Sequence, residues 1–213
     1  MTSILKAALT AAVITGFSTS AVAGTLSVPE FAQADMELFE DDLVLPSTTA
    51  NFDANTPIAL VRIDGGRMIT TPYQEADDWA TLSETLAQPI RHLSPAAYLS
   101  AASETPVDGQ EADNTLDVIR LAAVDTGYKY VLIYGTGKDA HFASFGGKSL
   151  RNTGLVVPVG SQSWQGGDAK ALLVETHSGT VIDAVTTWAP DMETLTRDVG
   201  EMIERLGAAQ STA

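Results

Sequence analysis

The chain has 213 residues, of which 27 are acidic and 12 basic, for a formal net charge of −15. Such a negative field repels phosphate backbones and anionic lipid head groups, so nucleic acid and lipid surfaces are excluded as expected ligands. There is no cysteine, which excludes a disulfide framework, a thiol nucleophile and an acylated N-terminal cysteine.

Residues 1–23 have the features of a secretory signal peptide. Lys6 is their only charge, an apolar stretch covers residues 7–17, and Ala21-Val22-Ala23 supplies the small residues that cleavage requires. We therefore expect export, to a bacterial periplasm, and a mature chain that begins near Gly24. No later stretch has the ~20 apolar residues of a spanning helix, so we expect no transmembrane span in the mature chain. An uncleaved membrane anchor is the alternative.

Residues 24–56 are predicted to form an acidic N-terminal arm or linker. They contain no lysine or arginine and carry seven acidic residues: Glu30, Asp35, Glu37, Glu40, Asp41, Asp42 and Asp53. One hypothesis is that Phe31, Leu38 and Phe39 form an apolar anchor that folds onto a partner. A solvated linker with no partner is the alternative interpretation.

The folded domain is predicted over residues 57–207. It opens with a strand at Ile58–Ile63, and Thr71-Pro72-Tyr73-Gln74 carries the signals of a helix start, with threonine as the N-cap. Pro89 ends this helix, and a second strand is expected around Ala97–Leu99. The buried stripe of the helix is expected to contain Trp79, Leu82 and Leu86.

The centre of the domain is predicted to be a helix followed by a buried strand. Leu116, Ile119 and Ala123 recur at helical spacing, and Gly127 stands where a left-handed residue ends a helix. The run Tyr130–Gly135 has no polar alternation, which is typical of a strand covered on both faces. We therefore expect a central strand with helices packed on it.

The last third of the domain is predicted to contain a hairpin and a helix. A glycine-rich region with short strands at 140–145 and 155–159 leads into a hairpin of residues 171–176 and 180–185. A final helix then begins at Pro190-Asp191 and ends at Gly207, and residues 208–213 form a disordered tail. The predicted fold is α/β, with a single mixed sheet of about five strands and three main helices.

No motif in the chain predicts a catalytic residue, a metal site or a cofactor. Gly147-Lys148-Ser149 resembles the end of a phosphate-binding loop, but Phe142 stands where that loop needs its first glycine. The three histidines lack zinc-site spacing, no Gly-x-Ser-x-Gly element is present, and the acidic loop at 104–113 lacks the calcium-loop pattern. Aromatic residues such as Trp188 are interpreted as sheet and core residues rather than a binding patch.

The order of the elements resembles a periplasmic α/β domain shared by three families. These are the TolB N-terminal domain, the curli secretion proteins and the penicillin-binding-protein activator lipoproteins. Their usual phrase Gly-Ala-Asp-Tyr-Val-Leu is matched here by residues 127–132, and their acidic Thr-Gly hairpin turn is matched loosely by residues 175–179. A fainter similarity, to rhombosortase-associated target lipoproteins, lies in Pro-Ala-Ala-Tyr-Leu and Leu-Asp-Val-Ile-Arg-Leu. The likeness covers roughly residues 57–206.

The resemblance implies a non-enzymatic envelope protein that binds other proteins, and it transfers no catalytic residue. The missing cysteine, the acidic arm and the glycine-rich stretch at 135–167 depart from the family pattern. The leading hypothesis is a periplasmic adaptor or envelope assembly factor that binds envelope proteins through an exposed sheet edge or the arm. Its oligomeric state is not predicted.

The alternative hypothesis is a small exported enzyme or a small-ligand-binding protein. Open α/β sheets bind ligands at loops beyond their strands, and the loops after the predicted central strand carry Asp139, His141 and Lys148. These three residues are the candidate ligand-binding residues of this alternative.

Overall fold

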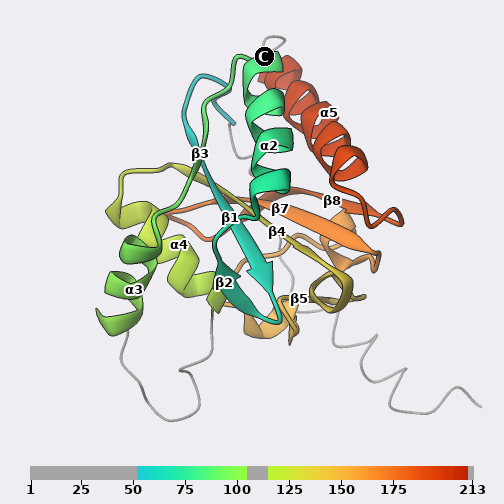
Figure 1. Cartoon of the computed structure of the whole chain (residues 1–213). Coiled ribbons are helices and arrows are strands. Elements are labelled where there is room, and N and C mark those ends of the chain that lie inside the picture. The colour runs from blue at the N-terminus through green and yellow to red at the C-terminus, as the bar shows by residue number, and fades with distance from the viewer. Residues whose placement is uncertain (1–51, 105–114, 211–213) are drawn as a thin grey trace, which may run out of the picture. The chain divides into compact units, whose positions relative to one another are not determined.

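The computed structural model describes residues 52–104 and 115–210 (Figure 1). The predicted signal peptide, the arm up to residue 51 with its anchor residues Phe31, Leu38 and Phe39, and residues 211–213 lie outside the described residues. The described part has a mixed sheet with helices on both faces, so the predicted α/β class is confirmed.

The main sheet has a path of five strands, in the order β2-β1-β4-β7-β8. Along this path the strands are β2 (Arg67–Ile69), β1 (Ile58–Asp64), β4 (Tyr130–Thr136), β7 (Ala169–Glu175) and β8 (Val181–Thr187). β3 (Ile90–His92) joins the sheet by pairing with β1. β1 is parallel to β3 and β4, whereas the β1–β2, β4–β7 and β7–β8 pairs are antiparallel, as predicted for a mixed sheet.

β4 is the central strand that the sequence predicts. It pairs with β1 on one side and with β7 on the other, and its first six residues are buried. Val131 and Ile133 belong to the core on one face, while Leu132 and Tyr134 belong to the core on the other. Both faces of the strand are therefore covered, which is why its sequence shows no polar alternation.

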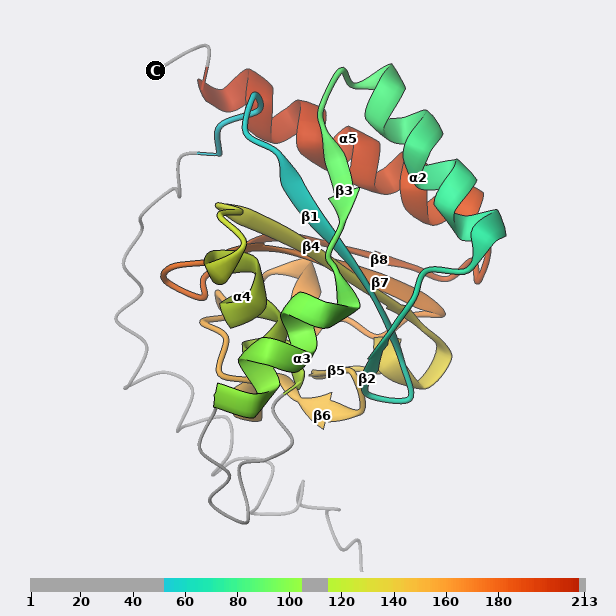
Figure 2. The ribbon, with the colours of Figure 1, turned by 60° about the vertical axis from the view of Figure 1, so that its left-hand side comes forward.

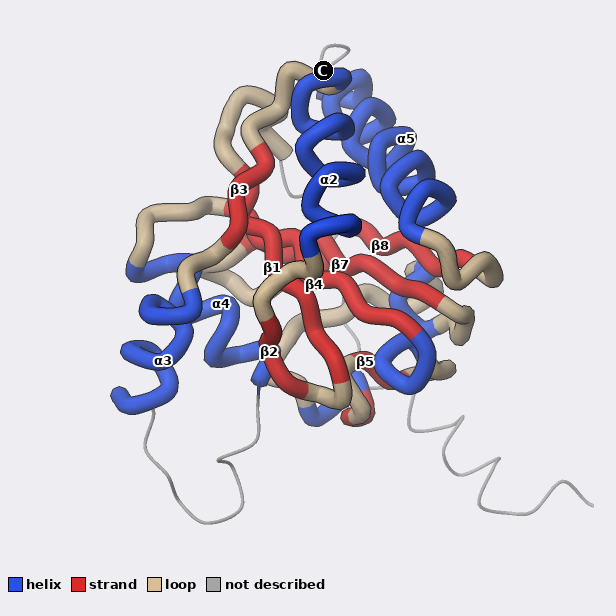
Figure 3. The backbone as a smooth tube through the Cα atoms, viewed as in Figure 1, coloured by secondary structure: helices blue, strands red, loops and turns tan. Residues whose placement is uncertain are grey.

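The described residues form four α-helices, one more than the three main helices predicted. α2 (Tyr73–Thr85) and α5 (Met192–Gln210) lie side by side on one face of the sheet (Figure 2). α3 (Pro95–Glu104) and α4 (Thr115–Asp125) pack together on the other face. The smooth tube of Figure 3 shows the main strands as one layer between these helix pairs.

The additional helix, α3, corrects the strand expected around Ala97–Leu99. The prediction was wrong because Ser94-Pro95 is a helix start: the Ser94 hydroxyl accepts a hydrogen bond from the Ala96 N–H, at 3.2 Å, and proline suits the first turn. Another short strand, β3, forms just before it. The apolar run Ala97–Leu99 is too short for its period to distinguish a strand from a helix.

Two element boundaries and the start of the domain also differ from the predicted ones. α2 begins at Tyr73 without a side-chain cap, because its N-cap residue is Pro72 and not Thr71, whose hydroxyl bonds to Nδ1 of His92. α5 continues past Gly207 to Gln210. Phe52 lies in the predicted arm but is only 1% exposed, and its ring lies 5.0 Å from that of Tyr130.

Candidate functional site

The chain turns sharply just beyond the central strand. The 3-10 turn η1 (Gly137–Ala140) follows β4 and carries the chain back against the strand end. A Cβ on Gly135 would lie 2.8 Å from the Cβ of Asp139, and Gly137 has a φ of +59°. Glycine is required at the first position by this close approach and favoured at the second by its backbone conformation.

Asp139 fastens this turn to the hairpin between β1 and β2. Its two carboxylate oxygens accept hydrogen bonds from the N–H groups of Gly65 and Gly66, each at 2.9 Å, and the residue is only 1% exposed. Hydrogen bonds to a charged acceptor are stronger than neutral ones. The carboxylate is therefore buried and bound within the fold.

Lys170 of β7 binds the backbone of two further segments near the end of the central strand. Its fully buried ammonium donates to the carbonyl oxygens of His141 and Ser144, at 3.1 Å each, and of Ser163 at 2.8 Å. Burial lowers the pKa of Lys170 to about 8, so at pH 7 its three N–H groups match the three acceptors. Lys170 thus joins the segment after η1 and the turn η3 (Gln162–Trp164) to the sheet.

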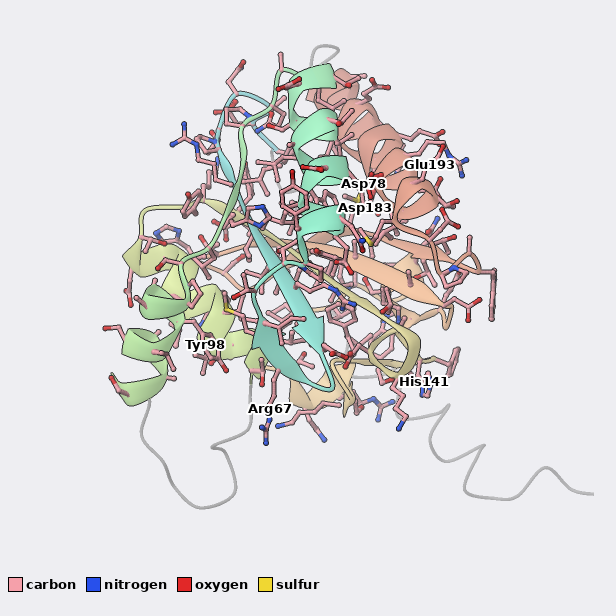
Figure 4. The ribbon with its side chains drawn as sticks, in the orientation of Figure 1. Arg67, Asp78, Tyr98, His141, Asp183 and Glu193 are labelled. Carbon is pink, nitrogen blue, oxygen red and sulfur yellow. The ribbon has the colours of Figure 1, made fainter. Side chains whose placement is uncertain are left out.

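A recess of about 340 Å³ lies beside these turns, at the end of the sheet where β4 and β8 finish and β7 begins. The recess is bounded by residues from three separate turns: Gly137, His141, Phe142, Gly166, Gly167, Asp168 and Trp188. Figure 4 shows His141 beside η1, at this end of the sheet. Phe142 follows η1, Asp168 precedes β7 and Trp188 follows β8, so the sheet topology brings them together.

Two aromatic side chains of the recess are unusually open to solvent. Phe142 is 76% exposed and Trp188 is 77% exposed. Both are large apolar groups that would gain by removal from water. The remaining polar side chains around the recess are His141 and Asp168, both exposed.

The wall of the recess needs glycine at two neighbouring positions. A Cβ on Gly166 would lie 2.7 Å from the backbone nitrogen of Phe142, and a Cβ on Gly167 would lie 2.5 Å from the carbonyl oxygen of Thr187. The backbone there is fixed by a hydrogen bond from the Gly167 N–H to the Ala140 carbonyl, at 2.9 Å. The recess is therefore built from closely packed backbone.

Of the three candidate ligand residues, only His141 lines this recess. Asp139 is buried and bound to the β1–β2 turn, and Lys148 lies in β6 (Lys148–Ser149), which pairs with β5 (Ser144–Phe145). The three do not converge on one hollow. Sequence reasoning missed Phe142 and Asp168, and it assigned Trp188 to the core, since a tryptophan at a strand end has the same local pattern whether buried or exposed.

The described residues contain no group of three or more histidine, aspartate or glutamate side chains arranged to hold a metal ion. None of the helices in this part of the chain combines the length and the apolar character needed to cross a membrane. The chain matches no family model, no curated protein and no solved structure.

Proposed function

We propose that this chain is a non-enzymatic, exported adaptor or assembly factor that binds an envelope protein through the aromatic recess. Here the aromatic recess means the hollow bounded by His141, Phe142, Asp168 and Trp188. The observation that carries the proposal is the pair of aromatic side chains, each more than three-quarters exposed, at one hollow. Exposed apolar groups that gather at one place are typical of interaction sites, and tryptophan is enriched among the residues that dominate binding energy.

The charge of the protein favours a basic partner segment. The chain has a formal net charge of −15, and Asp168 adds a carboxylate to the recess itself. The faces of tryptophan and phenylalanine attract lysine and arginine side chains. We therefore infer that an arginine or lysine of the partner enters between Phe142 and Trp188.

The sheet provides a route by which an extended segment reaches the recess. β8 ends the strand order, and Trp188 is the residue directly after it. Val156 already bonds to Gly179 and Val181 at the start of β8. A partner strand added beside the later residues of β8 would gain main-chain hydrogen bonds and direct a side chain toward Trp188. The proposal thus combines a sheet edge with an aromatic anchor.

The test is site-specific photocrosslinking in the protein's own envelope. A photoreactive phenylalanine replaces Phe142, and in a matched control it replaces Leu99, which is 65% exposed on α3. We expect a protein product from position 142 that position 99 does not give. Trp188→Ala should remove this product, and Leu99→Ala should leave it unchanged.

Ionic strength supplies a second readout, because screening shortens the Debye length from about 10 Å at 0.1 M to about 3 Å at 1 M salt. We expect the yield from position 142 to fall as salt rises. Equal products from both positions, or a product that survives Trp188→Ala, would contradict the proposal. Fractionation of the same cells tests export, since an adaptor found only in the cytoplasm cannot meet an envelope protein.

The arm is tested separately by deleting residues 24–51. The deletion stops at residue 51 because Phe52 belongs to the core. If the anchor of Phe31, Leu38 and Phe39 binds the partner, the deletion weakens capture while the melting temperature stays unchanged. Unchanged capture would leave the recess alone as the binding surface.

A small ligand in the same recess is the second candidate, and the volume of about 340 Å³ favours it, since ligand pockets usually measure about 300–1,000 Å³. In that case photocrosslinking yields no protein product. His141→Ala should then reduce the rise in melting temperature that low-molecular-weight periplasmic extract produces, whereas Leu99→Ala should not.

A further inference from the structure

A second hollow, also of about 340 Å³, lies on the other side of β1. β3 and β2 pair with the same edge of β1, one after the other: β3 pairs with Ile58–Leu60 and β2 pairs with Arg62–Asp64. The two short strands therefore separate near Val61, and α2 passes over this division (Figure 1). Open α/β sheets bind ligands in the crevice that forms where the chain segments after neighbouring strands diverge.

Most of the wall of this hollow is apolar. The apolar residues come from β1, β2, α2 and the segment after β3: Leu60, Met68, Ile69, Ala76, Leu93 and Pro95. Tyr73, the first residue of α2, is 81% exposed and forms part of the rim. A lining of this kind binds the apolar part of a ligand, and a few polar groups fix the orientation of that ligand.

The one charged side chain of the wall, Arg62, is neutralised within the fold. Its Nε lies 3.0 Å from Oε2 of Glu75, and the Tyr134 hydroxyl donates to the same oxygen at 2.8 Å. Nη2 of Arg62 donates to the hydroxyl of Thr136 at 3.0 Å, and Nη1 donates to the carbonyl of Ile63. The guanidinium is thus held in an ion pair and does not select an anionic ligand.

Besides Arg62, the polar side chains that line the hollow are Thr70, Thr71, Tyr73 and His92, and of these Thr71 and His92 form a bonded pair. The Thr71 hydroxyl and Nδ1 of His92 are 3.1 Å apart, and both residues line the hollow. Partial burial lowers the pKa of His92, so its ring is neutral at pH 7. A neutral imidazole that bonds through Nδ1 has a second nitrogen, which accepts or donates according to the tautomer.

We propose that the edge pocket, the hollow between α2, β2 and β3, binds a small uncharged amphiphile. Its aromatic or alkyl body lies against Leu60, Met68 and Ala76, and one hydroxyl, amide or ring N–H bonds to the Thr71–His92 pair. This site is distinct from the aromatic recess, because the two hollows share no lining residue.

Indole is a suitable probe because it combines a flat apolar body with one N–H donor, and 1-methylindole is its matched control without the donor. We expect indole titration of the ¹⁵N-labelled protein to shift the amide resonances of Thr71, Tyr73 and His92. Indole should bind about fivefold more tightly than 1-methylindole, which corresponds to one ordinary hydrogen bond. The anion indole-3-carboxylate should bind more weakly than indole.

Two variants separate filling of the pocket from loss of its polar group. Ala76→Phe places a ring in the hollow and should weaken indole binding at least tenfold; Ala76→Leu serves if the larger residue impairs folding. The double variant Thr71→Val, His92→Phe keeps the shape of both side chains but removes the hydroxyl and both ring nitrogens, so the preference for indole over 1-methylindole should disappear. Trp188→Ala, in the aromatic recess, should leave indole binding unchanged.

Three results would overturn the proposal: resonance shifts scattered over the surface or centred on Trp188, indole binding that Ala76→Phe or Ala76→Leu leaves intact, and an indole preference retained in the double variant Thr71→Val, His92→Phe. Each is decided by indole binding in a folded variant, so failure here is distinguishable from failure of the crosslinking at position 142.

Discussion

Titration of Lys170 should make the protein more stable as the pH rises from neutral. Lysine has an ordinary pKa of 10.5, and burial lowers that of Lys170 to about 8 in the folded state. Between these two values the unfolded chain binds the proton and the folded chain does not. The unfolding free energy therefore increases with pH through this window, and this contribution disappears as the pH falls through 8.

The size of this effect follows from the two pKa values. One pKa unit corresponds to about 1.4 kcal/mol, so a shift of this size gives a total of about 3 kcal/mol, of which about 2.5 kcal/mol accrues between pH 7 and pH 10. The carbonyl oxygens of His141, Ser144 and Ser163 favour the charged form and make this an upper value.

Urea denaturation of the mature protein at several pH values measures the effect, with Lys170→Met as the matched control. The variant lacks the titrating group but keeps every other lysine and tyrosine, so the difference between the two unfolding free energies isolates Lys170. The variant should be less stable than the wild type at pH 7, because three buried carbonyls lose their donor, and the gap should widen toward pH 10. A gap that stays constant or narrows would refute the reasoning, and Lys170→Gln repeats the comparison if the methionine variant does not fold.

Three further changes test the packing around the recess and the start of the core. Asp139→Ala should lower the unfolding free energy by about 3 kcal/mol or more, since two charge-assisted hydrogen bonds are lost; a loss below 1 kcal/mol in urea denaturation would contradict this role. Gly167→Ala should cost about 1–3 kcal/mol because its Cβ would meet the Thr187 carbonyl, and a melting temperature equal to that of the wild type would show that the backbone yields. Truncation to a chain that starts at residue 54 should lower the melting temperature, whereas a start at residue 52 should not, because only the shorter chain loses the Phe52 ring from the core.

The elements that sequence reasoning predicted are those whose environment is uniform along the chain. Tyr130–Tyr134 is apolar throughout because both faces of β4 are covered, and Ala171–Val174 of β7 is apolar and buried for the same reason. The α4 helix shows its buried stripe at helical spacing, with Leu116, Ile119 and Ala123 all buried. In each case one local pattern and one tertiary environment agree.

The candidate sites could not be predicted in the same way because they depend on contacts between distant segments. The aromatic recess joins Phe142 to Trp188, and only the order of β4, β7 and β8 in the sheet brings them together. The two buried cations are a similar case. Arg62 and Lys170 each interrupt an apolar run of a strand, which predicts an outward side chain, whereas their partners include Glu75 in α2 and His141 in the loop after β4.

These two buried cations change how the charge of the molecule should be judged. The formal charge of −15 includes the positive charges of Arg62 and Lys170, yet both side chains are buried. Arg62 is paired with Glu75, so that pair contributes almost nothing outside the fold, while the charge of Lys170 is enclosed by carbonyl oxygens. The surface therefore presents fewer cations than the sequence count suggests, and Asp168 is the acidic side chain at the aromatic recess. This is why the proposed partner segment is basic and why its capture should weaken as salt is added.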